Sequence, residues 1–214
     1  LRVATHLFYL EDAKRLLAMG TGMVAHSVRD VDVDEAFISQ LRESGVCYVP
    51  TLTRELSTFV YSDRPAFFDD PFFTAHAHRG EVERVSERPF MERMGASPAA
   101  AGYRTALEQA MNNLKTLSDA GLPIAMGTDS GPGARFPGYF AHMELWMMVE
   151  AGMTPAQALL SATSGAANCL GTSDRGTLEE GKWADFLVLT ADPLRDIEST
   201  RSLETVYIAG RPLR

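Results

Sequence analysis

Three polar side chains of this sequence lie in short apolar segments and could act together. His6 lies in segment 3–7, His26 in segment 22–27 and Asp129 in segment 123–130. Two imidazoles and a carboxylate form a ligand set suited to zinc or a similar divalent ion. His6 and His26 are 20 residues apart, the length of one strand–helix unit, which predicts adjacent strands with both side chains at the same height.

Each of these residues also has a simpler interpretation. A single histidine in an apolar strand is more often a hydrogen-bonded core residue than a metal ligand. Asp129, in Gly-Thr-Asp-Ser-Gly, could serve only as a helix cap or an Asx turn. A metal-free enzyme using all three groups as acids and bases is a further alternative. Their coincidence at three predicted strand ends makes a metal site about as well supported as these alternatives.

The elements that must position these residues alternate along the chain. Apolar segments 3–7, 22–27, 46–52 and 123–130 predict strands. The intervening patterns predict helices at 11–19, around 35–44, 99–120, 138–151 and 154–170, and the last begins with a Thr154/Gln157 capping box. Strands alternating with helices predict an α/β fold with a parallel sheet, in which polar residues at the strand ends gather at one edge.

Two regions depart from this alternation. Residues 53–97 are rich in aromatic residues, proline and charge, and are too long for an ordinary connection, which is typical of a functional lid. They contain His76-Ala77-His78, which follows no apolar strand and is interpreted as a mobile or substrate-proximal segment. Near the C-terminus, segments 185–190 and 205–209 predict strands without a helix between them, as in a small β unit.

Composition excludes several classes of protein. The 214 residues carry a net charge of −8, and no basic stretch is long enough for a nucleic-acid footprint. The apolar runs are far shorter than the ~20 residues of a membrane span. Cys47 and Cys169 are 122 positions apart, so we expect neither a disulfide framework nor a thiolate metal site. The compartment stays open: cytoplasmic, or exported if a signal has been lost with the N-terminus.

Several short motifs together resemble the amidohydrolase superfamily, in particular its imidazolonepropionase-like members. They are Thr5-His6, Ala25-His26-Ser27, Gly127-Thr128-Asp129-Ser130, and the segments Leu159–Gly171 and Gly176–Leu189. The resemblance implies the C-terminal half of a (β/α)₈ barrel, strands 5–8, at residues 1–171 with the insertion at about 53–97. It also implies that residues 172–214 supply strands of a small β-sandwich.

The same resemblance implies a metal-dependent hydrolase of C–N bonds in amides, cyclic amides or dipeptides. His6, His26 and Asp129 would bind the divalent metal, expected to be zinc as one or two ions. Asp129 would also be the catalytic base, taking a proton from the attacking water and returning it to the leaving nitrogen. The partner is then a small amide or peptide-like substrate.

The sequence departs from the family pattern in two respects. Members carry an H-x-H after strand 1, and many carry a carboxylated lysine on strand 4, but strands 1–4 are absent from this sequence. The alternative is therefore a catalytically incomplete fragment or a non-catalytic binding half-barrel. A chain without the N-terminal half of the barrel would leave strand edges unpaired, so we expect it to self-associate, for example as a homo-oligomer, or to stay partly unfolded.

Four further residues are candidates for substrate binding. Arg54 follows the third predicted strand, and Arg135 and Tyr139 follow the fourth, on loops that contact substrates in barrels. Either arginine could bind a carboxylate with two hydrogen bonds, although a solvated surface charge is equally compatible with the sequence. For His142, on the following helix, packing or a hydrogen bond near the site is the favoured interpretation.

Overall fold

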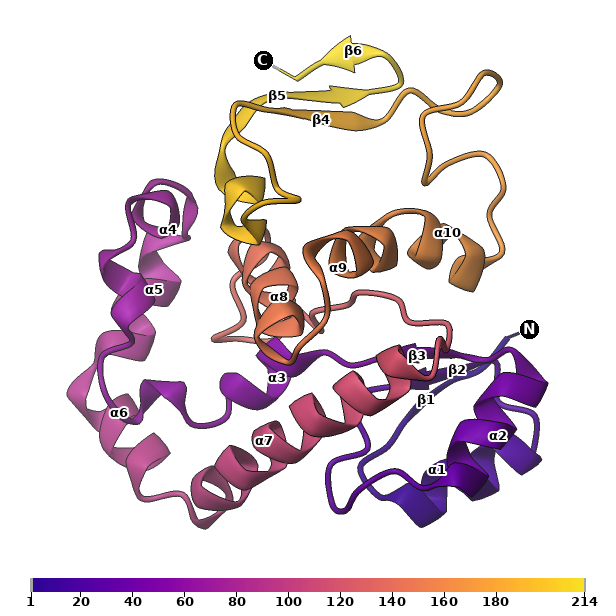
Figure 1. The fold of residues 1–214 in the computed structure, drawn as a ribbon. Coiled ribbons are helices and arrows are strands. Elements are labelled where there is room, and N and C mark those ends of the chain that lie inside the picture. Colours follow the sequence, from indigo (N-terminus) through magenta and orange to yellow (C-terminus); the bar gives the residue numbers. More distant parts are fainter. Residues whose placement is uncertain (1, 214) are drawn as a thin grey trace.

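A short parallel sheet forms the centre of the molecule. The structure is a computed structural model that describes residues 2–213. The sheet has the order β1 (Ala4–His6), β2 (Met23–Ala25), β3 (Cys47–Val49), as Figure 1 shows. The register aligns His6 with Ala25 and Ala25 with Val49, so the three strands end at one edge. The predicted parallel α/β arrangement is confirmed for these strands.

The fourth predicted strand, 123–130, is reduced to a single bridge between Tyr48 and Ile124. Its amides follow the sheet only as far as Ala125, whose N–H donates to the Tyr48 carbonyl at 3.0 Å. The next amide, of Met126, donates instead to the Ser161 carbonyl at 2.9 Å, which turns the chain away from the sheet. The prediction of a full strand was therefore wrong, although Asp129 still follows the sheet edge.

Helices α1 (Leu10–Ala18) and α2 (Glu35–Ser44) connect the first three strands and pack against each other. The Asp34 side chain accepts a hydrogen bond from the first turn of α2, and Gly45 ends this helix with φ 62°. Glycine adopts this left-handed conformation without steric strain, so the helix ends at Gly45 as predicted.

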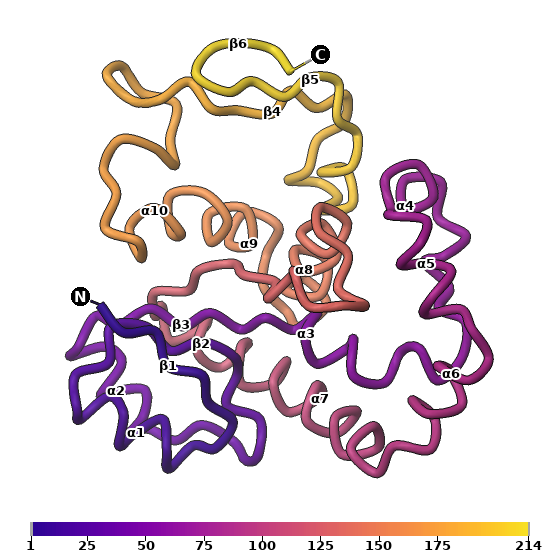
Figure 2. Tube along the Cα trace, turned by 180° about the vertical axis from the view of Figure 1, so that it is seen from behind, coloured from indigo at the N-terminus to yellow at the C-terminus, as the bar shows by residue number. Residues whose placement is uncertain are grey.

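The long insertion folds into short helices and returns to the sheet through one long helix. Its elements are α3 (Leu52–Leu56), η1 (Val60–Ser62), η2 (Ala66–Asp69), α4 (Pro71–His76), α5 (Arg79–Ser86), α6 (Arg88–Gly95) and then α7 (Pro98–Asp119). Helices α4–α6 lie on the opposite side of the molecule from α1 and α2 (Figures 1 and 2). Aromatic rings anchor them: Phe68 and Phe73 stack 5.1 Å apart, and the buried Tyr61 hydroxyl donates to the Ala134 carbonyl at 2.6 Å. The insertion is thus packed onto the loop that follows Asp129.

Two further predictions need correction. After α8 (Tyr139–Glu150), the predicted helix 154–170 divides at Thr163 into α9 (Pro155–Ala162) and α10 (Ser164–Leu170), although its Thr154/Gln157 capping box is confirmed. At Gly165 a Cβ would lie 2.8 Å from the Leu160 carbonyl oxygen, so the chain needs glycine at this break.

The second correction concerns the two cysteines. Cys47, at the start of β3, and Cys169, on α10, form a disulfide, contrary to the expectation that they are unrelated. Their separation of 122 residues carries no sign of contact, because the fold alone brings α10 beside β3.

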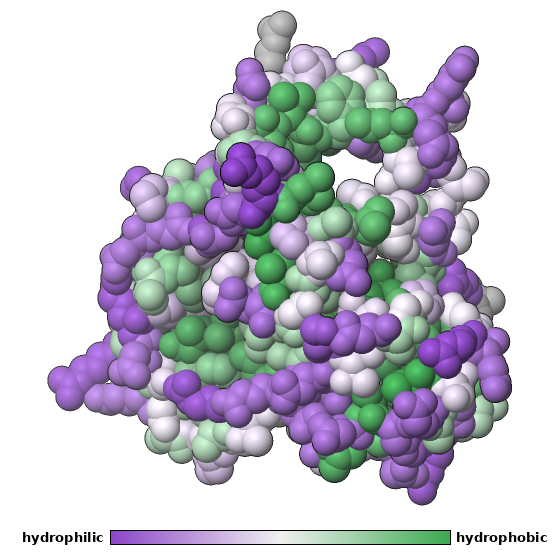
Figure 3. All heavy atoms as spheres, viewed as in Figure 1, coloured by the Kyte–Doolittle hydropathy of each residue, from purple (hydrophilic) through white to green (hydrophobic). Residues whose placement is uncertain are grey.

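A separate antiparallel sheet forms the C-terminal region, as predicted. It consists of β4 (Phe186–Leu189), β5 (Leu203–Ile208) and β6 (Arg211–Pro212), with η3 (Ile197–Arg201) packed on α8. Helices α8–α10 lie between the two sheets (Figure 2). Apolar side chains gather on the small sheet (Figure 3), where Leu187, Ile208 and Leu213 are more than half exposed. In the described residues, no helix is both long and apolar enough to cross a membrane.

Candidate active site

The fold brings together the three residues that the sequence selected. The rings of His6 and His26 lie edge to face, with centroids 4.4 Å apart. His26 Nε2 lies 3.9 Å from the Asp129 carboxylate oxygen Oδ2. All three are at the carboxyl edge of the parallel sheet, because β1 and β2 end in register and Asp129 follows the bridge at Ile124. This edge is where parallel α/β folds place their ligands.

The backbone at this edge is strained. His26, Thr51 and Asp129 have φ values of 71°, 53° and 51°, in the left-handed region that residues with a Cβ rarely adopt. Each such residue costs on the order of 1–3 kcal/mol, and strain of this kind clusters at functional sites. The left-handed residues follow β2, β3 and the Ile124 bridge.

Both imidazoles are held in the neutral form. Burial, and after it the neighbouring His6 ring, lower the pKa of His26 to about 4. For His6, burial is again the main cause of a lowered pKa, followed by the positive charges of Arg54 and Arg29. His26 Nδ1 lies 2.6 Å from the Thr51 hydroxyl, so the second ring nitrogen is left to face Asp129. A neutral imidazole with one free nitrogen is the form that binds metals.

A buried ionic cluster, which the sequence did not reveal, lies beside the histidines. Glu55 is fully buried between Arg29, whose Nε is 3.1 Å away, and Arg54, whose Nη1 is 2.9 Å away. Burial raises the pKa of Glu55 and lowers that of Arg29. Arg54 also lies over the Tyr103 ring at 5.0 Å, so its guanidinium already has partners. No sequence signal distinguishes Arg29 and Glu55 from surface charges, because only the fold buries them.

Of the four candidate substrate-binding residues, Arg135 is the one that bonds directly to a strand-end residue, Asp129. Its guanidinium bonds the Asp129 carboxylate, and also the Asp129 carbonyl oxygen at 3.1 Å. Tyr139 and His142 have partners elsewhere: the Tyr139 hydroxyl donates to Asp70 at 2.9 Å, and His142 Nδ1 lies 3.0 Å from the Thr200 hydroxyl.

Comparison with known proteins identifies the family. The family model described as "Amidohydrolase family" matches residues 2–213. The chain belongs to the amidohydrolase family. Over 103 residues it is 40% identical to an imidazolonepropionase from Deinococcus radiodurans, a match that covers 46% of this chain and 26% of that protein.

Solved structures show the same fold. A Xaa-Pro dipeptidase with methionine bound in its active site has a TM-score of 0.73 at 22% identity, covering all of this chain and 45% of that one. An ochratoxinase from A. niger has a TM-score of 0.69 at 22% identity, covering 99% of this chain and 41% of that one. The amidohydrolase chain thus spans less than half the length of these relatives.

The amidohydrolase family generally uses divalent metals, and the donor types at the strand ends fit one. Two neutral imidazoles and a half-exposed carboxylate converge there. Within residues 2–213, however, no three histidine, cysteine or acidic side chains are arranged to hold an ion together. The Asp129 carboxylate is paired with Arg135, and its Oδ2 lies 3.9 Å from His26 Nε2.

His76 and His78 lie apart from the strand-end histidines but border a hollow of about 390 Å³. Its lining includes Glu81, Arg135 and Phe136, so it adjoins the guanidinium that bonds Asp129. His76 Nδ1 lies 2.8 Å from the Phe72 carbonyl oxygen, and His78 Nδ1 accepts from the Glu81 amide at 3.3 Å. The insertion therefore forms one wall of a space beside the candidate site.

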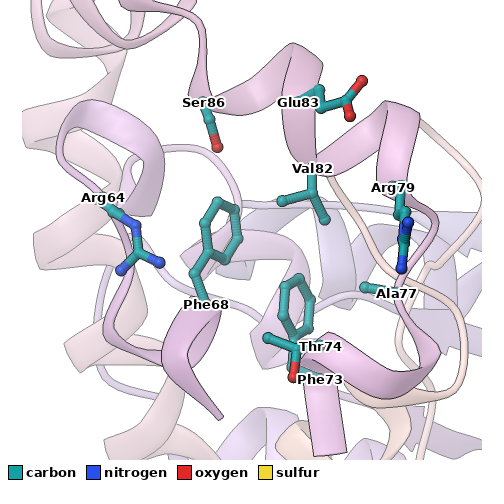
Figure 4. A pocket seen from close by; sticks show the side chains of 9 residues that line it. All are labelled: Arg64, Phe68, Phe73, Thr74, Ala77, Arg79, Val82, Glu83 and Ser86. Atoms are coloured by element: carbon teal, nitrogen blue, oxygen red, sulfur yellow. The ribbon is translucent and has the colours of Figure 1, made fainter. Parts of the chain in front are cut away.

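A second hollow, of about 220 Å³, lies inside the insertion (Figure 4). Phe68 and Phe73 point into it, and Arg64 and Arg79 flank it. Arg64 is already bonded to Asp69 at 2.7 and 2.8 Å. Of the described residues that line this hollow, none belongs to the strand-end group.

Proposed function

We propose that this chain is the C-terminal part of a metal-dependent amidohydrolase that cleaves C–N bonds in amides, cyclic amides or dipeptides. The observation that carries the proposal is the convergence of His6, His26 and Asp129 at one sheet edge. In this proposal residues 1–171 are strands 5–8 of a (β/α)₈ barrel, and residues 172–214 contribute strands to a β-sandwich. The names of the similar imidazolonepropionase and dipeptidase support cyclic amides and dipeptides as the substrate classes.

His6, His26 and Asp129 would hold the divalent metal, for which zinc is the expected ion. When bound, the metal would supply Lewis-acid chemistry that activates water and polarises the scissile carbonyl. The lowered pKa values of both histidines keep a lone pair available at neutral pH. The packing of both rings also restricts their orientation before any ligand arrives.

Asp129 is the proposed catalytic base. Its side chain is 36% exposed, so it can reach a water, and it can pass the proton to the leaving nitrogen. Arg135 bonds this carboxylate and thereby fixes its position before the reaction.

Arg135 is also the proposed contact for a substrate carboxylate, because it lies between Asp129 and the hollow bordered by His76 and His78. Substrate binding there would exchange one carboxylate partner of Arg135 for another and release Asp129. Arg54 has a different proposed role: it is bonded to Glu55 and adds positive charge near the histidines. Tyr139 and His142 are bonded to Asp70 and Thr200, so a substrate contact by either side chain would compete with these partners.

One observation favours a second candidate, a half-barrel that binds a ligand without turnover. In the described residues, no three potential ligands are arranged around a common point. A metal held by this chain alone would then need a rearrangement of Asp129.

Metal analysis and hydrolysis assays on the full-length protein test the proposal. We expect bound divalent metal and turnover of a panel of cyclic amides and dipeptides, both lost on removal of the metal and restored by zinc. His26→Ala should lose metal, whereas the matched control His142→Ala should retain it. An active preparation without metal would exclude this mechanism, and bound metal without turnover on any substrate would favour the non-catalytic candidate.

A further inference from the structure

Glu144, on α8, is a buried acid for which the proposed reaction has no direct use. Its side chain is fully buried, and no arginine or lysine within residues 2–213 forms an ion pair with it. Instead it accepts three hydrogen bonds from two residues: Leu52 N–H at 2.7 Å, Thr53 N–H at 2.8 Å and the Thr53 hydroxyl at 2.7 Å. Burial raises its pKa to about 7, and the donors from Thr53 and Leu52 oppose that rise. Burying an acid without a countercharge is costly unless hydrogen bonds replace the lost hydration, and Glu144 has three of them.

Those bonds determine the path of the chain directly after β3. Leu52 and Thr53 follow Thr51, whose φ of 53° is strained for a β-branched residue. The Glu144 carboxylate binds the next two amides, so it holds the turn that this strained residue begins. The strained Thr51 in turn places its hydroxyl 2.6 Å from His26 Nδ1.

The same carboxylate reaches toward the third strand-end residue. The Thr53 hydroxyl, bonded to Glu144, also lies 3.3 Å from the carbonyl oxygen of Thr128. Thr128 immediately precedes Asp129, whose own backbone is left-handed. Glu144 is therefore linked to the loop of Asp129 through Thr53, and to the ring of His26 through Leu52 and Thr51.

We propose that Glu144 is a positioning residue: through Thr51 it fixes the orientation and tautomer of His26. A neutral imidazole has one N–H, and a hydroxyl held at Nδ1 can accept a hydrogen bond from that N–H. The lone pair then stays on Nε2, the nitrogen that faces Asp129 at 3.9 Å. A metal-binding histidine commonly has its other nitrogen oriented by such a partner. The catalytic consequence rests on the proposed function, whereas the effect on the His26 tautomer does not.

Imidazole nitrogen chemical shifts, measured by NMR on the metal-free full-length protein, test this directly. We expect the proton of His26 on Nδ1 in the wild type. Thr51→Val removes the hydroxyl and should transfer a large fraction of the proton to Nε2, whereas Thr51→Ser should retain the wild-type shifts. Glu144→Gln should move the His26 shifts in the same direction as Thr51→Val.

Asn113→Asp is the matched control for loss of stability. Asn113 is as deeply buried as Glu144 and bonds backbone groups of Val28, Val31 and Val33 at 2.9 Å, so its isosteric replacement disturbs an equivalent network. It should lower the melting temperature and leave the His26 shifts unchanged. In the loaded enzyme, Glu144→Gln should reduce metal affinity or kcat by about 10–100-fold with little change in KM.

Three results would overturn the proposal: a wild-type proton on Nε2, His26 shifts that Glu144→Gln does not alter, or equal shifts in Glu144→Gln and Asn113→Asp. If Glu144→Gln does not fold, Thr53→Val removes one of the three donors and should give a smaller shift in the same direction. Unchanged shifts in folded Thr53→Val would then decide against the proposal. Altered shifts in a protein that neither binds metal nor hydrolyses any substrate would refute the proposed function and leave the positioning role intact.

Discussion

Two pairs of histidines in this molecule show how misleading sequence spacing can be. His76 and His78 are two residues apart, in the pattern most familiar for metal ligands, yet each bonds its own helix. His6 and His26 are 20 residues apart, and their rings are in contact at 4.4 Å. Burial lowers the pKa of both members of the distant pair. Proximity at this site thus comes from strand register rather than from the number of intervening residues.

The backbone explains the difference. The β1–β2 register aligns His6 with Ala25, so the next residue, His26, completes the row at the sheet edge. His76 ends α4, whereas His78 precedes α5, so the chain changes direction between them. The two side chains therefore belong to different helices, and a ring nitrogen of each is bonded locally.

The largest expected effect is on catalysis, where a variant of the strand-end pair should lose far more activity than a variant of the insertion pair. In the full-length enzyme, His26→Ala should reduce kcat/KM by more than about 100-fold, since loss of a ligand should exceed the 10–100-fold loss typical of its supporting residues. His78→Ala should change kcat less than about threefold, because His78 only borders the neighbouring hollow. Metal content, measured with kcat and KM on the same preparations, should fall only for His26→Ala. Equal losses for both variants would remove the functional distinction between the pairs.

The next prediction concerns how much the disulfide stabilises the fold that holds the strand-end pair. Cys47 begins β3, and its bond to Cys169 closes a long loop that includes both Thr51 and the insertion. Reduction should lower the free energy of unfolding by about 2–5 kcal/mol, as measured by denaturant titration. A Cys47→Ser/Cys169→Ser variant serves as the control, since a reducing agent should not destabilise it further. Two free thiols in the unfolded, unreduced protein would contradict the bond.

Local signals predicted part of this structure well. Gly45 and the Thr154/Gln157 capping box are effects within one turn of helix, and both are as predicted. The strand ends at His6 and His26 were predicted because the alternation of strand and helix fixes the register of neighbours. Their proximity followed from that register alone.

The features that sequence reasoning missed depend on distant contacts. The Met126 amide leaves the sheet for the Ser161 carbonyl, the two cysteines meet across 122 residues, and Glu144 reaches Thr53 from another helix. Each requires knowledge of which helix packs beside which strand. Glu144 had no signal of its own, because an acid in a mostly apolar helix can equally point to solvent.

The pH dependence of the free energy of unfolding should test the burial of His26 and His6. The pKa of His26 is about 4 in the folded protein and 6.5 in the unfolded chain, so the unfolded state binds the proton first as pH falls. The contribution of this histidine is complete above pH 6.5 and is lost progressively between pH 6.5 and 4. It amounts to at most ~3 kcal/mol, and the lowered pKa of His6 acts in the same direction.

Denaturant titrations of metal-free protein across this range measure that slope. His26→Gln should flatten it relative to the wild type. Because all other titrating groups are common to these proteins, the difference between slopes isolates the histidine. A wild-type slope in His26→Gln would mean that the buried ring is protonated as easily in the folded protein as in the unfolded chain.

The smallest expected effect concerns the structural role of the insertion pair. His78 is the N-cap of α5 and accepts the Glu81 amide through Nδ1 at 3.3 Å. His78→Ala should therefore destabilise the protein by about 1 kcal/mol, and His78→Asn, which supplies another cap acceptor, should restore most of that loss. Denaturant midpoints of the three proteins measure the difference, and His76→Ala shows whether any loss is specific to the cap. If Asn does not restore stability, His78 contributes through packing against the loop of Arg135, and the insertion pair is closer to the active site than its hydrogen bonds indicate.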